Sequence, residues 1–242
     1  MDNIWFEDEL TLSHEVIDEE AIRIEKSARG DHNSIAAELS HIARGFVRVQ
    51  KPDWMLMPKK ESNDLLTSGQ KPAFYLIRMI FEFEIPNEQY QQGLRFTYAR
   101  CSSYIWTTDT SVSKPEVYDL YPKDLYEGEP QKVSLKVGPE ITVDKISGSV
   151  GEIASDVVVG QISPVTVGYL GRDKQEPHWE LRPQNKSLLG RQYLWMVICR
   201  PQDCHSFRLS ARAEAVIETK FGPFTIGPKV KSWDHRPSIR ID

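Results

Sequence analysis

The sequence predicts a mainly β protein with a small α part: an antiparallel β-sandwich preceded by an N-terminal helical hairpin. Several short stretches alternate apolar and polar residues with the period of two that half-buried strands require. Turn-forming residues separate these stretches, and no helices alternate with them, which argues against a parallel sheet. Only the first part of the chain shows the longer apolar spacing of helices.

The chain has 242 residues, of which 40% are hydrophobic and 27% charged, a composition typical of soluble globular proteins. It is long enough to bury a substantial core. We divide it into three parts. Residues 1–50 form an acidic arm and a helical hairpin packed on the main body, 51–228 a β-sandwich domain, and 229–242 a basic C-terminal tail.

Two helical patterns follow the acidic start of the chain. Between residues 15 and 29 the apolar residues recur at spacings of four, three and four, and Gly30 is a natural stop. A second pattern covers residues 35–46. Because the link between them is short, we expect the two helices to fold back on one another and to pack against the β body.

Two strand pairs are the clearest part of the main body. In residues 74–86 the apolar residues from Ile77 to Ile85 share one side, and residues 94–106 follow after a turn, so we expect a long hairpin. Residues 193–199 and 207–217 predict a second pair. In its second strand, apolar residues from Phe207 to Ile217 alternate with polar ones, as in half-buried antiparallel strands.

The segment from 146 to 171 has only two charged residues, Glu152 and Asp156. Its end alternates aliphatic and aromatic residues with small polar ones, a pattern shared by sandwich strands and by β-hairpins that insert into membranes. Pro164 favours the ordinary sheet, and insertion into a bilayer stays open as the alternative. The residues that would face a membrane or a partner are Val157, Val159, Ile162, Val165, Val167 and Tyr169.

Motifs for catalysis are absent from the sequence. There is no G-x-S-x-G elbow, no phosphate-binding loop and no dinucleotide fingerprint. The H-x-E order of His178 to Glu180 occurs in zinc deaminases, but the P-C-x-x-C motif that accompanies it there is missing. We therefore expect no enzyme activity, no catalytic residue and no cofactor.

A ligand pocket is an alternative use of the region from His178 to Arg191. Trp179 is predicted to fill the core while its two neighbours point outward, which is the simpler interpretation. In the alternative, an aromatic pocket uses an arginine as an anchor for an anion. The candidate ligand-binding residues are His178, Trp179, Glu180, Arg182 and Arg191.

Cys199, Cys204 and His205 form a C-x4-C-H pattern around the turn between the last predicted strand pair. This spacing is allowed for zinc but does not identify a zinc site. Cys199 also continues an apolar strand pattern, as a buried small hydrophobic residue would. We predict no metal site and keep these three residues as weak candidates.

Charge and cysteine content suggest the compartment and exclude one class of partner. A net charge of −5 and a pI near 5.8 argue against nucleic-acid binding. The acidic amino terminus is unlike a secretory signal, and three cysteines are too few for a disulfide scaffold, so we expect a cytoplasmic protein, recruited to a membrane only under the alternative. The basic tail and the acidic start could contact each other or a second copy, although two solvated ends are the simpler interpretation.

The main functional prediction is a non-enzymatic soluble β-sandwich protein that acts through protein–protein interaction or self-association. The first alternative is a membrane-active protein, a pore former or a cell-death or defence effector, that inserts its Ser/Gly/Val-rich β segment. The second is a small-ligand binder or enzyme that uses the His178–Arg191 region. The expected partner is a protein or a second copy, with membrane lipid under the first alternative.

Overall fold

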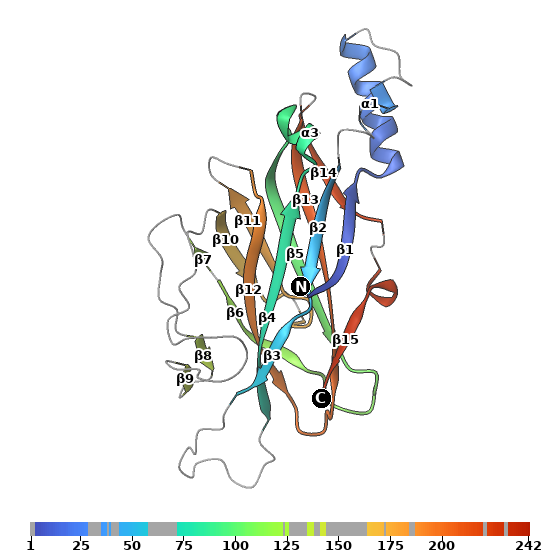
Figure 1. Ribbon diagram of the computed structural model, residues 1–242. Helices are drawn as coiled ribbons and strands as arrows, with labels where there is room; N and C mark the ends of the chain where they lie inside the picture. Colours follow the sequence, from blue (N-terminus) through green and yellow to red (C-terminus); the bar gives the residue numbers. More distant parts are fainter. Residues whose placement is uncertain are drawn as a thin grey trace.

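A computed structural model describes residues 3–28, 35–37, 39, 44–57, 72–122, 124–125, 135–137, 141–143, 164–171, 173–183, 187–219, 222–229 and 232–242. Within these residues the protein is mainly antiparallel β, with few helices (Figure 1). The first elements are β1 (Ile4–Thr11), α1 (His14–Ala28), β2 (Arg44–Gln50), β3 (Asp53–Leu56), β4 (Ala73–Glu84), α3 (Asn87–Gln91), β5 (Arg95–Trp106), β6 (Glu116–Tyr121) and β7 (Asp124–Leu125). The later ones are β8 (Leu135–Val137), β9 (Ile141–Val143), β10 (Pro164–Tyr169), β11 (His178–Pro183), β12 (Gly190–Arg200), β13 (Phe207–Thr219), β14 (Gly222–Pro228), the 3-10 turn η1 (Trp233–His235) and β15 (Ser238–Ile241).

In the described part of the chain, 13 strands form one continuous hydrogen-bonded sheet in the order β6-β12-β4-β2-β1-β14-β13-β5-β11-β10-β7, with β3 beside β4 and β15 beside β13. The sheet curls into a nearly closed, barrel-like body, and its two edge strands, β6 and β7, are consecutive in the sequence. The predicted β-sandwich is therefore corrected to a barrel-like sheet. The physical reason is β1, which pairs with β2 on one side and with β14 on the other and so joins what would otherwise be two layers.

Both predicted hairpins are wrong in their pairing. β4 pairs with β12, β2 and β3, whereas β5 pairs with β11 and β13; likewise β12 and β13 do not pair with each other. Each connection instead carries the chain across the core, so that consecutive strands meet through their side chains, as in the edge-to-face contact of Phe83 with Phe96 at 5.9 Å. The alternation pattern is the same for a hairpin and for such a crossing.

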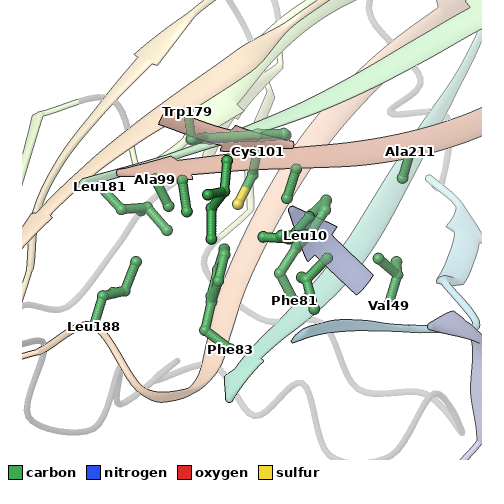
Figure 2. Close-up of a cluster of buried hydrophobic side chains, with 14 of the residues drawn as sticks. Leu10, Val49, Phe81, Phe83, Ala99, Cys101, Trp179, Leu181, Leu188 and Ala211 are labelled. Carbon is green, nitrogen blue, oxygen red and sulfur yellow. The ribbon is translucent and has the colours of Figure 1, made fainter. Parts of the chain in front are cut away.

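The predicted inward faces are confirmed. The apolar residues of β4 from Ile77 to Phe83 and those of β13 from Phe207 to Ile217 lie in one hydrophobic core. Figure 2 shows how this core is filled from strands that are far apart in the sequence, including Leu10 of β1, Phe81 of β4, Cys101 of β5 and Trp179 of β11. Burial of such side chains stabilises each by about 1.5–3 kcal/mol, which makes the core the main support of the barrel.

The acidic start of the chain forms a strand of the sheet. Asp8 of β1 pairs with Arg236, whose side chain is only 1% exposed, and Glu9 pairs with Lys229 at 3.2 Å. The two ends of the chain therefore meet within one molecule. Helix α1 matches the first predicted helix and extends beyond the ends of the strands (Figure 1). A helical hairpin is not confirmed, because only residues 35–37 and 39 of the second segment are described.

No helix among the described residues has both the length and the apolar character needed to cross a membrane.

Candidate functional site

Strand β11 separates the candidate ligand-binding residues between two faces. Trp179 points into the core and is completely buried, and its indole nitrogen has no hydrogen-bond partner among the described residues. His178 and Glu180 lie on the opposite, outer face, in agreement with the predicted orientation. Arg182 follows on the same outer face and binds Glu180 at 2.8 Å. These side chains therefore do not converge on one pocket.

Arg191 lies elsewhere in the sheet. It belongs to β12, seven positions along the sheet order from β11, and its guanidinium pairs with Glu82 of β4 at 3.3 Å. The structure therefore does not bring the two predicted anion anchors, Arg182 and Arg191, together. Their role in ligand binding stays a prediction.

The environment of His178 is aromatic and charged. Its ring stacks on Tyr169 of β10 with 4.8 Å between centroids, and its Nδ1 lies 3.3 Å from a guanidinium nitrogen of Arg100 on β5. Partial burial, followed by the positive charge of Arg100, lowers the pKa of His178 below its ordinary value. Nearby, burial and then the charge of Glu180 raise the pKa of Tyr98 to about 12.

Strand β10 reverses the usual orientation of polar and apolar residues. Thr166 points inward and is only 2% exposed, and Gly168 faces the ring of Trp179 on the same side. Val167 and Tyr169 point outward, with Tyr169 42% exposed. Small residues thus face the barrel interior and apolar residues face outward, which is the arrangement found in strands that contact lipid.

The other predicted segment residues are described in part or not at all. Val165 belongs to β10, and its main chain pairs with Arg182 of β11, but its side chain lies outside the description. Val157, Val159 and Ile162 lie outside the described residues. Their contact with a membrane or partner stays a prediction.

Four side chains that were not anticipated from the sequence gather on the outer face of the sheet, the face to which His178 and Glu180 of β11 point. Tyr104 of β5 stacks on Trp106 at 5.2 Å and on Trp233 of η1 at 5.6 Å, and the guanidinium of Arg212 on β13 lies 4.4 Å from the Trp233 ring. We use "aromatic ladder" for these four residues. Tyr104 and Trp106, two positions apart in one strand, were readable as sharing a face, but nothing in the sequence connected them with the tail.

The ladder continues toward β10 through cross-strand neighbours. Arg212 pairs in register with Ser102 of β5, and Ser102 pairs with His178, which in turn lies opposite Tyr169. Tyr169, His178, Arg212 and the three ladder rings therefore share one outer face. Aromatic rings with a polar edge and arginine side chains are the groups favoured where a protein meets the headgroup layer of a membrane.

The three weak metal candidates do not form a metal centre in the described part of the chain, where no group of three or more His, Cys, Asp or Glu side chains is placed to hold an ion. Cys199 and Cys204 are free thiols, and burial raises the pKa of each. Cys204 donates to the main-chain oxygen of Ser206 at 3.3 Å. A thiol with a raised pKa is a poor metal ligand at neutral pH, because the thiolate is the form that binds.

Comparison with known proteins gives no family and some distant structural likeness. No family model and no curated protein matches the sequence. Among solved structures, the Clostridium perfringens NetB toxin in its membrane-inserted form matches with a TM-score of 0.34 and 5% identity, over 81% of this chain and 88% of that one. The Clostridium perfringens delta-toxin matches with a TM-score of 0.39 and 10% identity over 82% of both chains. A structure described as a pore forming protein matches with a TM-score of 0.36 and 8% identity, over 81% of this chain and 90% of that one.

These matches correct the main functional prediction. The sequence predicted a soluble β-sandwich that acts through protein–protein contacts, whereas the solved structures that resemble this chain include a toxin in its membrane-inserted form and a pore forming protein. At TM-scores below 0.5 they carry no argument about how this chain would act. The proposal below therefore uses this chain's own residues, and the absence of catalytic activity stays a prediction.

Proposed function

We propose that this chain is a membrane-active, pore-forming protein that assembles from several copies and inserts the charge-poor segment ending in β10. The observation that carries the proposal is the reversed alternation of β10, with Thr166 and Gly168 inside and Val167 and Tyr169 outside. A strand of a soluble barrel gains little from this arrangement, because Tyr169 is exposed to water and Val167 is only partly buried. The same arrangement suits a strand with lipid on one side and a polar lumen on the other.

The sequence before β10 supports the proposal. Residues 146–163 continue the charge-poor composition, with Glu152 and Asp156 as the only charged side chains. A membrane-spanning strand requires about 9–11 residues, so residues 146–169 provide enough chain for two. Because one pair of strands cannot close a pore by itself, the proposal requires self-association, with each copy contributing a pair.

The aromatic ladder supports the approach to a membrane. Trp106, Tyr104 and Trp233 present rings with polar edges, and Arg212 adds a charge that a lipid phosphate can accept. The ladder lies on the outer face that also carries Tyr169, so docking on this face would bring the end of β10 close to the headgroups. Lipid is accordingly the proposed partner besides other copies of the chain. With three free cysteines, we propose a reducing compartment, the cytoplasm, as the starting location.

Release of an entrapped dye from liposomes tests the function when the wild type is compared with two lysine variants. Val167→Lys places a charge on the outer side of β10, next to the Glu180 carboxylate, where the soluble barrel tolerates it. A lysine costs about 2–4 kcal/mol at the bilayer centre and about 0–1 kcal/mol at the interface, and residue 167 lies near the end of the segment, so release by this variant is expected to fall by about threefold to tenfold.

Val216→Lys is the matched control. Val216 is a half-buried outer residue of β13, opposite Tyr98, and is not part of the charge-poor segment. This variant is expected to release dye like the wild type. An equal loss of dye release in both variants would contradict the proposal. So would a wild type that releases no dye from neutral or anionic liposomes at any concentration. Thermal unfolding of each variant, measured in parallel, verifies that the barrel is intact.

A further inference from the structure

His178 sits at a point where an added proton would oppose the pairing of β10. The guanidinium of Arg100 can only donate hydrogen bonds, so the Nδ1 of His178, 3.3 Å from an Arg100 nitrogen, must act as the acceptor. A neutral imidazole with its proton on Nε2 satisfies this contact. Protonation would convert Nδ1 into a donor and place two positive groups at hydrogen-bond distance.

The surrounding carboxylates are already engaged. Glu180, on the same strand, binds Arg182 at 2.8 Å and also forms a hydrogen bond with Tyr98. Glu176, in the connection before β11, binds Arg212 of β13 at 2.9 Å. Both carboxylates still favour a protonated His178, but each acts on it less strongly than Arg100 does. Among the described residues, the ring also meets the uncharged Tyr169 on β10 and Ser102 on β5. Arg100 is therefore the dominant charge that a protonated His178 would meet.

The contact partner of His178 is the end of a weakly held strand. β10 pairs with β11 over six residue pairs, whereas on its other side the described residues of β7 contribute two, at Thr166 and Val167. The stack of Tyr169 on His178 is the side-chain contact that fastens the last residue of β10, and aromatic contacts of this kind are worth about 0.5–1.5 kcal/mol. A loss of this contact leaves that end held by main-chain pairing with β11.

We propose that His178 is a proton-operated latch: when the imidazole takes up a proton, Arg100 repels it, the stack on Tyr169 is lost, and β10 separates more readily from β11 in mildly acidic solution. The lowered pKa of His178 agrees with this direction. A group whose pKa is lower in the folded state contributes stability above its ordinary value of 6.5, and that contribution is lost as the pH falls through the folded-state pKa.

The consequence for activity rests on the function proposed above, since β10 ends the segment that is proposed to insert. If both the latch and the proposed function are correct, dye release rises on acidification. The latch itself is a property of the soluble protein, so it is measured without lipid.

Hydrogen exchange of β10 main-chain amides tests the latch, with the wild type compared near pH 7.5 and near pH 5.5 after correction for the chemical exchange rate at each pH. We expect the amides of Gly168 and Tyr169 to open several-fold more often at the lower pH. In His178→Gln, whose amide oxygen accepts from Arg100 but takes up no proton, this response is expected to disappear. His205→Gln, at an exposed turn residue, is the matched control and should respond like the wild type.

A second variant keeps the latch testable if His178→Gln fails to fold. Arg100→Gln removes the opposing charge while leaving His178 able to titrate, so its response to pH should be clearly smaller than that of the wild type. The latch is refuted if the exchange of β10 in the wild type is the same at both pH values, or if His178→Gln and Arg100→Gln respond as strongly as the wild type. A wild type that opens in acid yet releases no dye would refute the proposed function and leave the latch standing.

Discussion

Strands β13 and β10 have the same alternation in sequence and opposite orientations in the barrel. Along β13 the apolar residues from Phe207 to Ile217 point into the core and the charged ones point outward. Along β10 the small polar Thr166 is buried while Val167 and Tyr169 face outward. A period of two identifies a strand, whereas the orientation of its two faces depends on what each face contacts. A strand whose apolar side chains face outward is a candidate for contact with lipid.

The largest effect is expected on the inner face of β13. Ala213 is fully buried, opposite Cys101 of β5, so Ala213→Asp would leave a carboxylate without a partner in the core. We expect the free energy of unfolding to fall by about 3–5 kcal/mol, as measured by urea denaturation. A loss below about 1 kcal/mol would mean that the inner face of β13 is not the closely packed surface described here.

A smaller effect is expected where β10 passes its neighbours closely. A Cβ atom at Gly168 would lie 2.8 Å from the main-chain oxygen of Pro122 and 3.4 Å from the Trp179 ring. Gly168→Ala should therefore reduce the free energy of unfolding by about 1–3 kcal/mol, as overpacking does elsewhere. Gly227→Ala in β14 is the control, because its Cβ would meet only the Glu214 side chain, at an ordinary 3.7 Å. Equal midpoints of thermal unfolding for the two variants would argue against the close packing of β10.

The smallest effect is expected on the outer side of β10. Tyr169→Ala removes the stack on His178 but no part of the core, so the loss of stability should be about 0.5–1.5 kcal/mol by urea denaturation near neutral pH. Below pH 6.5, the ordinary pKa of histidine, the difference in free energy of unfolding between the variant and the wild type should shrink, because protonation of His178 weakens the same contact. A difference that stays constant across this range would separate the stack from the charge of His178.

Sequence reasoning located the strands better than it located their neighbours. The inward faces of β4 and β13 and the position of α1 follow from local periodicity, and each agrees with the structure. Strand partners do not follow from it, because β4 and β5, or β12 and β13, alternate identically whether they pair or cross the core. The same limit hid β1, whose acidic residues suggested a solvated arm although they pair with Arg48, Arg236 and Lys229.

The candidate site was foreseen only in part, for related physical reasons. The charge gap around β10 and the outward orientation of His178 were readable, since both are local properties. The aromatic ladder was not, because Trp233 lies 129 positions after Tyr104 in the chain and meets it through the pairing of β15 with β13 and of β13 with β5. The reversal of β10 was hidden as well, because Thr166 and Val167 are of similar size and either could face a core.

The depth of residue 167 in a membrane tests insertion through β10 without relying on pore function. Val167→Cys, made in a Cys199→Ser background because Cys199 is only half-buried, would carry an environment-sensitive fluorophore, with Val216→Cys labelled in the same way as the control. With liposomes, we predict a blue shift at position 167 and quenching by groups attached to the lipid tails, with neither at position 216. A label at position 167 that stays in water while the liposomes leak would contradict insertion through β10.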